Sequence, residues 1–410
     1  MNIFYLSYKN ILSRPLSSLL SWLLLSFGVC VVVLLLLLSD RFKDEVTRNS
    51  AGVDLVIGAK GSPLQIILSS IFHIDFPTGN IDISDIMPFT KNRYIERTTP
   101  LSLGDSYNGY RIVGTIQNYG ALYDAQLDLG SWFDAPLEAV IGSQVASEMG
   151  LKTGDRFSSQ HGLDEEGDDH GDHGFEVVGI LKSTGLVIDR LILVDMQSIW
   201  MVHDHEHEEE AETDSLVAIP DWGSKLSAKQ IEEHQITSLL VKFRSPMGAV
   251  MLPNQVNQTS NLQAASPAFE ASRLFSILEN VTKVMNFLGL IIIAISGVSV
   301  FISLLNSLKD RKYEIAILRS IGASRRLVLS GILFEGLIIT GFGVITGFLL
   351  GHSIILILFK QLLGRSAGFM SFAPGEGLLF IACIAIGIFA SVIPAVMAYR
   401  TDISKTLAQG

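Results

Sequence analysis

Four long runs of apolar residues divide the chain, and each run is free of acidic and basic side chains. Every run holds at least 23 residues. At about 1.5 Å per residue, a helix of that length crosses the ~30 Å hydrocarbon core of a bilayer. We therefore predict an α-helical membrane protein with four transmembrane helices, whose expected ranges are 16–39, 281–308, 327–359 and 377–399.

Between the first two spans, residues 40–280 show the mixed pattern of a large α/β domain. In the stretch AVIGSQVASEMGLKTGDRF, a strand-like run leads into a short helix, and Gly150 stands where a helix C-cap is expected. The segment YNGYRIVGTI alternates apolar and polar residues as a strand does. The other connections, 309–326 and 360–376, are too short to form domains.

Charge orients these segments across the membrane. Residues 40–280 carry 17 Lys and Arg against 36 Asp and Glu, whereas the rest of the chain carries 13 against 5. Basic loops face the cytoplasm in membrane proteins. We therefore expect a membrane protein in which residues 40–280 and the 360–376 loop are extracytoplasmic. The N-terminal segment 1–15, the 309–326 connection and the 400–410 tail are then cytoplasmic.

Composition agrees with this class and leaves no sign of an enzyme. The chain is 48% hydrophobic and 17% charged, and its mean hydropathy is +0.40. It contains no H-E-x-x-H, G-x-S-x-G or C-x-x-C motif, and the GAKGS stretch at Gly58 lacks the spacing of a phosphate-binding loop. We expect no catalytic residue and no cofactor-binding residue on this chain.

Histidine is concentrated in two acidic loops, at 161–174 and 201–235. Seven of the nine histidines lie between His161 and His234. Neutral imidazoles beside carboxylates suit zinc or a similar ion, although a tract of this kind is not a defined site. A solvated acidic loop, weak zinc capture and dedicated metal transport all fit the pattern. The candidate ligands are His203, His205, His207, His170 and His173.

The connection NSLKDRKYEIAILRSIGASRR separates the second and third spans and has the pattern of an amphipathic helix. Tyr313, Ile317 and Ile321 recur at four-residue spacing, whereas Ile315 lies off that stripe. Gly322 can end the helix and the next residues can start another. A contact with a protein partner explains the exposed apolar positions, and an interfacial helix lying on the lipid is the alternative.

The third span has further features that bear on packing. Its glycines give it a smooth face, which is consistent with a dimer. Glu335, near the start of the span, is expected near the cytoplasmic interface or facing another helix, because a carboxylate at mid-bilayer costs roughly 2.5 to 3.5 kcal/mol. The glycines are at positions 336, 341, 343, 347 and 351.

The stretch KDRKYEIAILRSIGASRRLVLSGILFEGLIITGFGVITGFLLG closely resembles the signature of the MacB/FtsX-like ABC transporter permeases, a family that includes the lipoprotein-releasing permeases. Two further segments resemble parts of that family. The family's N-terminal amphipathic helix and first span are similar to IFYLSYKNILSRPLSSLLSWLLLSFGV, and its periplasmic core domain is similar to AVIGSQVASEMGLKTGDRF. In that family the cytoplasmic helix docks on a separate ATPase. The resemblance implies these coupling residues: Arg311, Glu314, Ile315, Ile317, Arg319, Ile321 and Gly322.

The resemblance also implies a location in the bacterial inner membrane, a function and partners. In such a system, the partner ATPase binds ATP and magnesium. ATP hydrolysis drives a conformational change that the permease subunit transmits to its extracytoplasmic domain, and this change exports or extracts a substrate. Expected partners are a cytoplasmic ABC ATPase, a second permease copy in a homodimer, a periplasmic or outer-membrane protein and membrane lipid, without nucleic acid. A zinc-handling ABC system and a complex that activates cell-wall hydrolases are the alternatives.

Overall fold

The structure is a computed structural model that describes residues 3–13, 15–161, 169–203, 216–219, 222, 225–363 and 372–400. The chain divides into two compact units. One comprises Met1–Lys43 and Ser276–Gly410, and the other comprises Asp44–Phe275. We call them the membrane unit and the extracytoplasmic unit.

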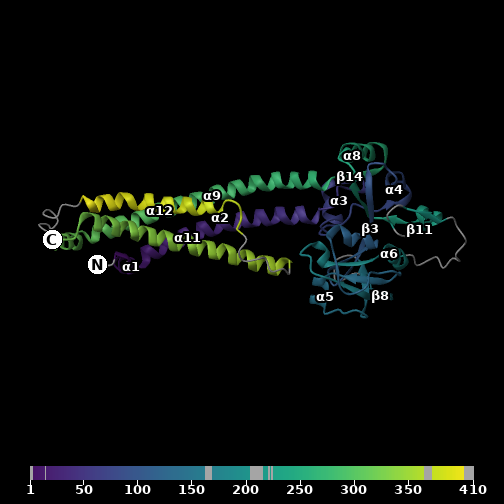
Figure 1. Ribbon diagram of the computed structural model, residues 1–410, viewed down its shortest axis with the longest axis horizontal. Helices are drawn as coiled ribbons and strands as arrows, with labels where there is room; N and C mark the ends of the chain where they lie inside the picture. Colours follow the sequence, from purple (N-terminus) through teal and green to yellow (C-terminus); the bar gives the residue numbers. More distant parts are fainter. Residues whose placement is uncertain are drawn as a thin grey trace. The chain divides into compact units, whose positions relative to one another are not determined.

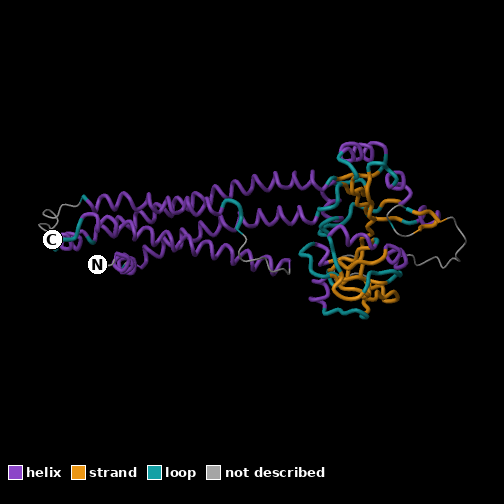
Figure 2. Tube along the Cα trace, in the orientation of Figure 1, coloured by secondary structure: helices purple, strands orange, loops and turns teal. Residues whose placement is uncertain are grey.

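The membrane unit is helical, and four of its helices are long and apolar enough to cross a membrane. Figures 1 and 2 show these helices as long rods, with α11 and α12 packed side by side. Together with the mixed α/β unit inserted between the first two spans, they confirm the predicted fold class. The helices are α1 (Ile3–Leu12), α2 (Pro15–Asn49), α9 (Pro267–Asp310), α10 (Lys312–Ser320), α11 (Arg325–Leu363) and α12 (Glu376–Tyr399).

Glycines on α11 allow α2 of the same chain to approach closely. A Cβ on Gly347 would lie 2.7 Å from the carbonyl oxygen of Ser26, and a Cβ on Gly351 would lie 2.8 Å from the side chain of Val33. Because lipid tails are as apolar as leucine, such van der Waals contact is a main source of helix association in a bilayer. The sequence suggested this face for a second permease copy, but the chain itself covers these two positions.

Polar side chains add specific bonds between the spans. The indole Nε1 of Trp22 donates to Thr346 Oγ1 at 3.0 Å, and Ser26 Oγ lies 2.6 Å from the same oxygen. Glu335 is buried and accepts from the Ser307 hydroxyl of α9 at 3.4 Å. The carboxylate therefore faces a neighbouring helix, which is one of the two positions that the sequence suggested for it.

The extracytoplasmic unit is built on a ten-stranded sheet with the order β14-β1-β13-β3-β4-β9-β6-β8-β5, in which β7 pairs with β3 and β8. Two short strand pairs, β10·β11 and β12·β2, lie outside it. Its strands are β1 (Leu55–Ala59), β2 (Ile81–Asp82), β3 (Ile95–Tyr107), β4 (Tyr110–Thr115), β5 (Leu127–Gly130), β6 (Glu138–Ile141), β7 (Arg156–His161), β8 (Asp169–Leu181), β9 (Leu191–Asp195), β10 (Leu216–Ala218), β11 (Lys225–Ser227), β12 (Gln235–Ile236), β13 (Ser238–Phe243) and β14 (Leu262–Ala265).

Helices cover this sheet and enclose three apolar cores. Most strand pairs are antiparallel, whereas β4·β9 and β6·β8 are parallel. Parallel neighbours need long connections, so these pairings join segments that are distant in sequence. The helices are α3 (Pro63–Ser70), α4 (Ile83–Thr90), α5 (Ser143–Met149), α6 (Met196–His203), α7 (Ala228–Glu233) and α8 (Met247–Thr259), with 3₁₀ turns at Gln117–Tyr123 and Val187–Arg190.

Two segments of this unit can be compared with the elements that their sequences predict. The predicted strand, helix and cap appear as β6, α5 and Gly150, whose φ is +69°. The strand predicted in YNGYRIVGTI is present as β4, Tyr110–Thr115, but it begins only after a turn at Asn108 and Gly109. Asn108 and Gly109 have φ values of +47° and +79° and form the turn of a β3–β4 hairpin. An Asn-Gly pair between strand-forming residues favours this turn, because both positions tolerate positive φ.

A buried carboxylate organises the loop before β9. Asp189 accepts hydrogen bonds from the backbone N–H of Thr184 at 2.9 Å and of Gly185 at 2.8 Å. It also accepts from the hydroxyls of Ser183 and Thr184 at 3.1 and 2.8 Å. Four donors around one carboxylate satisfy its lone pairs and offset its removal from water.

A second buried network contains His73, a non-glycine residue with a φ of +53°. Its Nε2 lies 3.0 Å from the hydroxyl of Tyr119, and the Arg111 guanidinium donates to its carbonyl oxygen at 2.9 Å. Burial, and then the nearby Arg111 charge, lower the pKa of His73 from 6.5 to about 3. The imidazole is therefore neutral at physiological pH, and the network holds the loop after α3 in its left-handed conformation.

Candidate ATPase-coupling site

Helix α10 is separated from α9 by a single residue. Arg311 has a φ of −106° and a ψ of 11°, which are not helical values, and α10 begins at Lys312. Lys309 and Asp310, which the sequence placed in the 309–326 connection, belong to the end of α9. The turn is therefore short, and the orientation of α10 depends on how this residue joins the two helices.

One face of α10 packs inward against three spans. Ile315 is 8% exposed and Ala316 is 1% exposed. Ile315 belongs to a cluster that contains Leu308 of α9, Val328 of α11 and Ala398 of α12. The sequence assigned Ile315 to the coupling residues, and its side chain is buried against the chain's own helices; the coupling assignment stays a prediction.

The opposite face of α10 carries an apolar stripe that the described residues leave partly exposed. Tyr313 is 49% exposed, Ile317 is 39% exposed and Ile321 is 80% exposed. The four-residue spacing places them on one side of the helix. Because a helix this short gains most of its stability from tertiary packing, the buried face holds α10 in place while the outer face stays open. We call Tyr313, Ile317 and Ile321 the outer stripe.

An ion pair borders the outer stripe. Arg311 Nε lies 3.1 Å from Glu314 Oε2, with the arginine largely covered and the glutamate exposed. Exposed pairs of this kind contribute at most about 1 kcal/mol, because water screens them. Glu314 is therefore available for contact, and reversing its charge places no charge in the packed core of the unit.

A tight turn ends α10 and starts α11. Gly322 has a φ of +113°, its N–H donates to the carbonyl of Arg319 at 3.1 Å, and the N–H of Ala323 donates to the carbonyl of Leu318 at 3.0 Å. These bonds form a Schellman motif, in which glycine supplies the left-handed residue. Ser324 then accepts from the N–H of Leu327 at 3.3 Å and caps α11. The turn predicted at Gly322 is confirmed.

The candidate zinc ligands lie mostly beyond what the structure describes. His205 and His207 are outside the described residues, and only the backbone of His203, His170 and His173 is placed, in α6 and β8. Among the described residues, no group of three or more His, Cys, Asp or Glu side chains is arranged to hold a metal ion. The zinc assignment stays a prediction.

Comparison with known proteins identifies the family. The model of the MacB-like periplasmic core domain matches residues 18–248, and that of the FtsX-like permease C-terminal domain matches residues 286–403. The chain belongs to the MacB/FtsX-like permease family. The second match contains α10 and the outer stripe, and permeases of this family work with a cytoplasmic ABC ATPase.

Two solved structures are similar to the extracytoplasmic unit. The periplasmic region of MacB from Actinobacillus actinomycetemcomitans is 12% identical, with 56% of this chain and 95% of that chain covered and a TM-score of 0.34. The extracellular domain of the noncanonic ABC-type transporter YknZ from Gram-positive bacteria is 13% identical, with 52% and 99% covered and a TM-score of 0.29. No curated protein matches the chain.

Proposed function

We propose that this chain is the transmembrane subunit of an ABC transporter and that α10 docks on a separate cytoplasmic ATPase. The observation that carries the proposal is the outer stripe, three exposed apolar side chains on a helix whose other face is packed. Large apolar side chains along the exposed face of a helix are typical of a helix that binds in a hydrophobic groove of a partner. The basic residues around α10 support a cytoplasmic position for it, the side on which an ABC ATPase would bind.

The packing of α10 provides a route for force. Its inner face contacts α9, α11 and α12, and both ends are short turns at Arg311 and Gly322. A push on the outer stripe is therefore passed to three spans, because a packed core deforms little. Of these, α9 continues into residues of the extracytoplasmic unit, as does α2. This arrangement supports mechanical transmission to that unit and the export or extraction of an extracytoplasmic substrate.

Purification from native membranes in mild detergent tests the proposal. Wild type is compared with Glu314→Lys, which reverses charge beside the outer stripe. The matched control is Glu279→Lys in α9, because Glu279 also forms an exposed ion pair, with Lys283 at 2.8 Å. A P-loop ATPase that co-purifies with wild type and the control, but not with Glu314→Lys, supports docking at α10. Equal recovery with all three proteins contradicts it.

The remaining partners follow from the family proposal. We expect a second copy of this permease, and a periplasmic or outer-membrane protein that accepts the substrate. Zinc delivery through the His-rich loops and activation of a cell-wall hydrolase remain alternatives with distinct signatures. Zinc retained by the protein and zinc-dependent ATPase activity favour the first, and capture of a hydrolase favours the second.

A further inference from the structure

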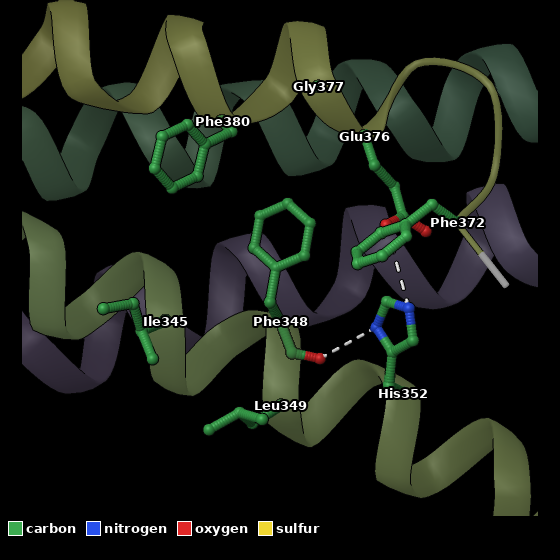
Figure 3. A pocket seen from close by; sticks show the side chains of 8 residues that line it. All are labelled: Ile345, Phe348, Leu349, His352, Phe372, Glu376, Gly377 and Phe380. Atoms are coloured by element: carbon green, nitrogen blue, oxygen red, sulfur yellow. Dashed lines mark hydrogen bonds and ion pairs between the residues drawn. The ribbon is translucent and has the colours of Figure 1, made fainter. Parts of the chain in front are cut away.

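A cavity of about 490 Å³ lies between α11 and α12 in the membrane unit. Its walls are mostly apolar and include three aromatic rings, those of Phe348, Phe372 and Phe380. Figure 3 shows Phe348 between the other two rings, with His352 and Glu376 at the same end of the cavity as Phe372. This cavity is separate from α10 and has no role in the proposed docking.

The polar end of the cavity contains a buried carboxylate with an unused acceptor. Glu376 is 2% exposed. Its Oε1 accepts from the backbone N–H of Ala373 at 3.1 Å, whereas its Oε2 makes no hydrogen bond within the described part of the chain. A buried charged oxygen without a donor is costly, so such an atom indicates a missing partner.

The imidazole of His352 does not supply that donor. Its Nδ1 lies 3.1 Å from the carbonyl oxygen of Phe348, an acceptor, so Nδ1 carries a proton. Its Nε2 lies 3.8 Å from Glu376 Oε2, which is too long for a hydrogen bond. Figure 3 draws both contacts, with the ring of Phe372 beside the gap between the two side chains.

The cavity has the polarity of a lipid molecule lying along the helices. Glu376 begins α12 at the extracytoplasmic end of the span, and His352 lies about 40 Å along α11 from its first residue, Arg325, which is more than the ~30 Å thickness of the hydrocarbon core. Farther along the cavity, Ile345, Leu349 and Phe380 are exposed on the outer surface of the described helices, where acyl chains lie. The carboxylate thus stands at headgroup depth, above an apolar groove.

Charge and geometry select the headgroup. A carboxylate repels an anion, and its free oxygen needs an N–H or O–H donor. A primary ammonium offers three donors and is also attracted to aromatic faces, whereas a quaternary ammonium has no N–H to donate. We propose that this cavity binds a membrane lipid with a primary ammonium headgroup, its ammonium on Glu376 Oε2 and one acyl chain along Ile345 and Leu349.

Headgroup selectivity of the full-length protein tests the proposal. The protein is placed in nanodiscs of phosphatidylethanolamine with phosphatidylglycerol, or of phosphatidylcholine with phosphatidylglycerol, and lipids retained after release are counted by native mass spectrometry. Wild type should retain phosphatidylethanolamine over phosphatidylcholine by about tenfold or more, the effect of one charge-assisted hydrogen bond. Glu376→Gln should lose this preference. The matched control, Glu335→Gln, should keep it, because that buried carboxylate lies outside the cavity.

Lipid retention by wild type alone can refute the proposal, so the test stays decisive even if Glu376→Gln misfolds. Equal retention of phosphatidylethanolamine and phosphatidylcholine by wild type refutes it, as does a preference that Glu376→Gln keeps. Binding of dodecylamine without any preference for phosphatidylethanolamine also refutes it, because the site then takes a free amine and not a membrane lipid. Selectivity lost in Glu376→Gln and kept in Glu335→Gln supports it.

Discussion

Replacing two residues of the outer stripe with serine should weaken ATPase binding without unfolding the permease. Ile317 and Ile321 are 39% and 80% exposed, so a partner can still cover those fractions of the two side chains. Full burial of an isoleucine side chain is worth about 1.5 to 3 kcal/mol. Scaled by the exposed fractions, Ile317→Ser with Ile321→Ser should cost about 2 to 3.5 kcal/mol, or about 30-fold to 400-fold in affinity.

The same substitution on the inner face provides the matched control. Serine and isoleucine have similar helix propensities, so the change has little effect on α10 itself. Ile315→Ser removes a buried side chain, and losing a buried isoleucine side chain costs about 2 to 5 kcal/mol of stability. It should therefore lower the thermal unfolding midpoint, whereas the outer double variant should lower it less, because its two side chains are more exposed.

Two measurements separate these effects. Binding of the purified ATPase subunit to the permease in nanodiscs gives the affinity, and a thermal melt of each permease gives its stability. The reasoning is refuted if the outer double variant binds as tightly as wild type, since the stripe would then not be the docking face. It is also refuted if that variant melts like Ile315→Ser, because the outer residues would then be part of the core.

Three further predictions concern the extracytoplasmic unit. Asp189→Asn should destabilise it by about 2 to 4 kcal/mol, because amide hydrogens then face donors, and a thermal melt of the full-length protein checks this. In the wild-type protein, the stability of the extracytoplasmic unit should be complete above pH 6.5 and fall as the pH drops toward 3, because unfolding exposes His73 and allows it to bind a proton. The free energy of unfolding should fall with a slope that approaches about 1.4 kcal/mol per pH unit. Denaturation at pH 7 and pH 5 should give a smaller difference in this free energy for His73→Asn than for wild type. Replacing both His-rich loops with Ser-Gly linkers should remove retained zinc, measured by atomic emission, and zinc kept by the loopless protein would exclude them as the site.

Much of the fold could be predicted because its signals are local. The four spans follow from charge-free runs of at least 23 residues, since burying an ionised side chain in hydrocarbon is costly wherever it lies. The turn after α10 follows from Gly322, the residue type that most readily adopts a φ of +113°. Family membership could also be predicted from the sequence, because the motif around α10 is contiguous.

Local sequence patterns could not predict which face of a helix is buried or which strands pair. Periodicity separated the outer stripe from Ile315, but only packing on Leu308 and Ala398 shows that Ile315 is turned inward. The hairpin at Asn108 was missed although its Asn-Gly pair is a local signal for such a turn, because the segment was interpreted as a strand from its alternation alone.

By itself, the sequence determined the class of the protein, its four spans, its topology prediction and the position of α10, because each depends on residues that are neighbours along the chain. Tertiary structure alone decided that glycines of α11 receive α2 and that Glu376 lies beside His352 in an apolar cavity. Those contacts join separate helices. Their free energy depends on distances and burial that no linear pattern contains, because side chains far apart in the chain meet only after the helices pack.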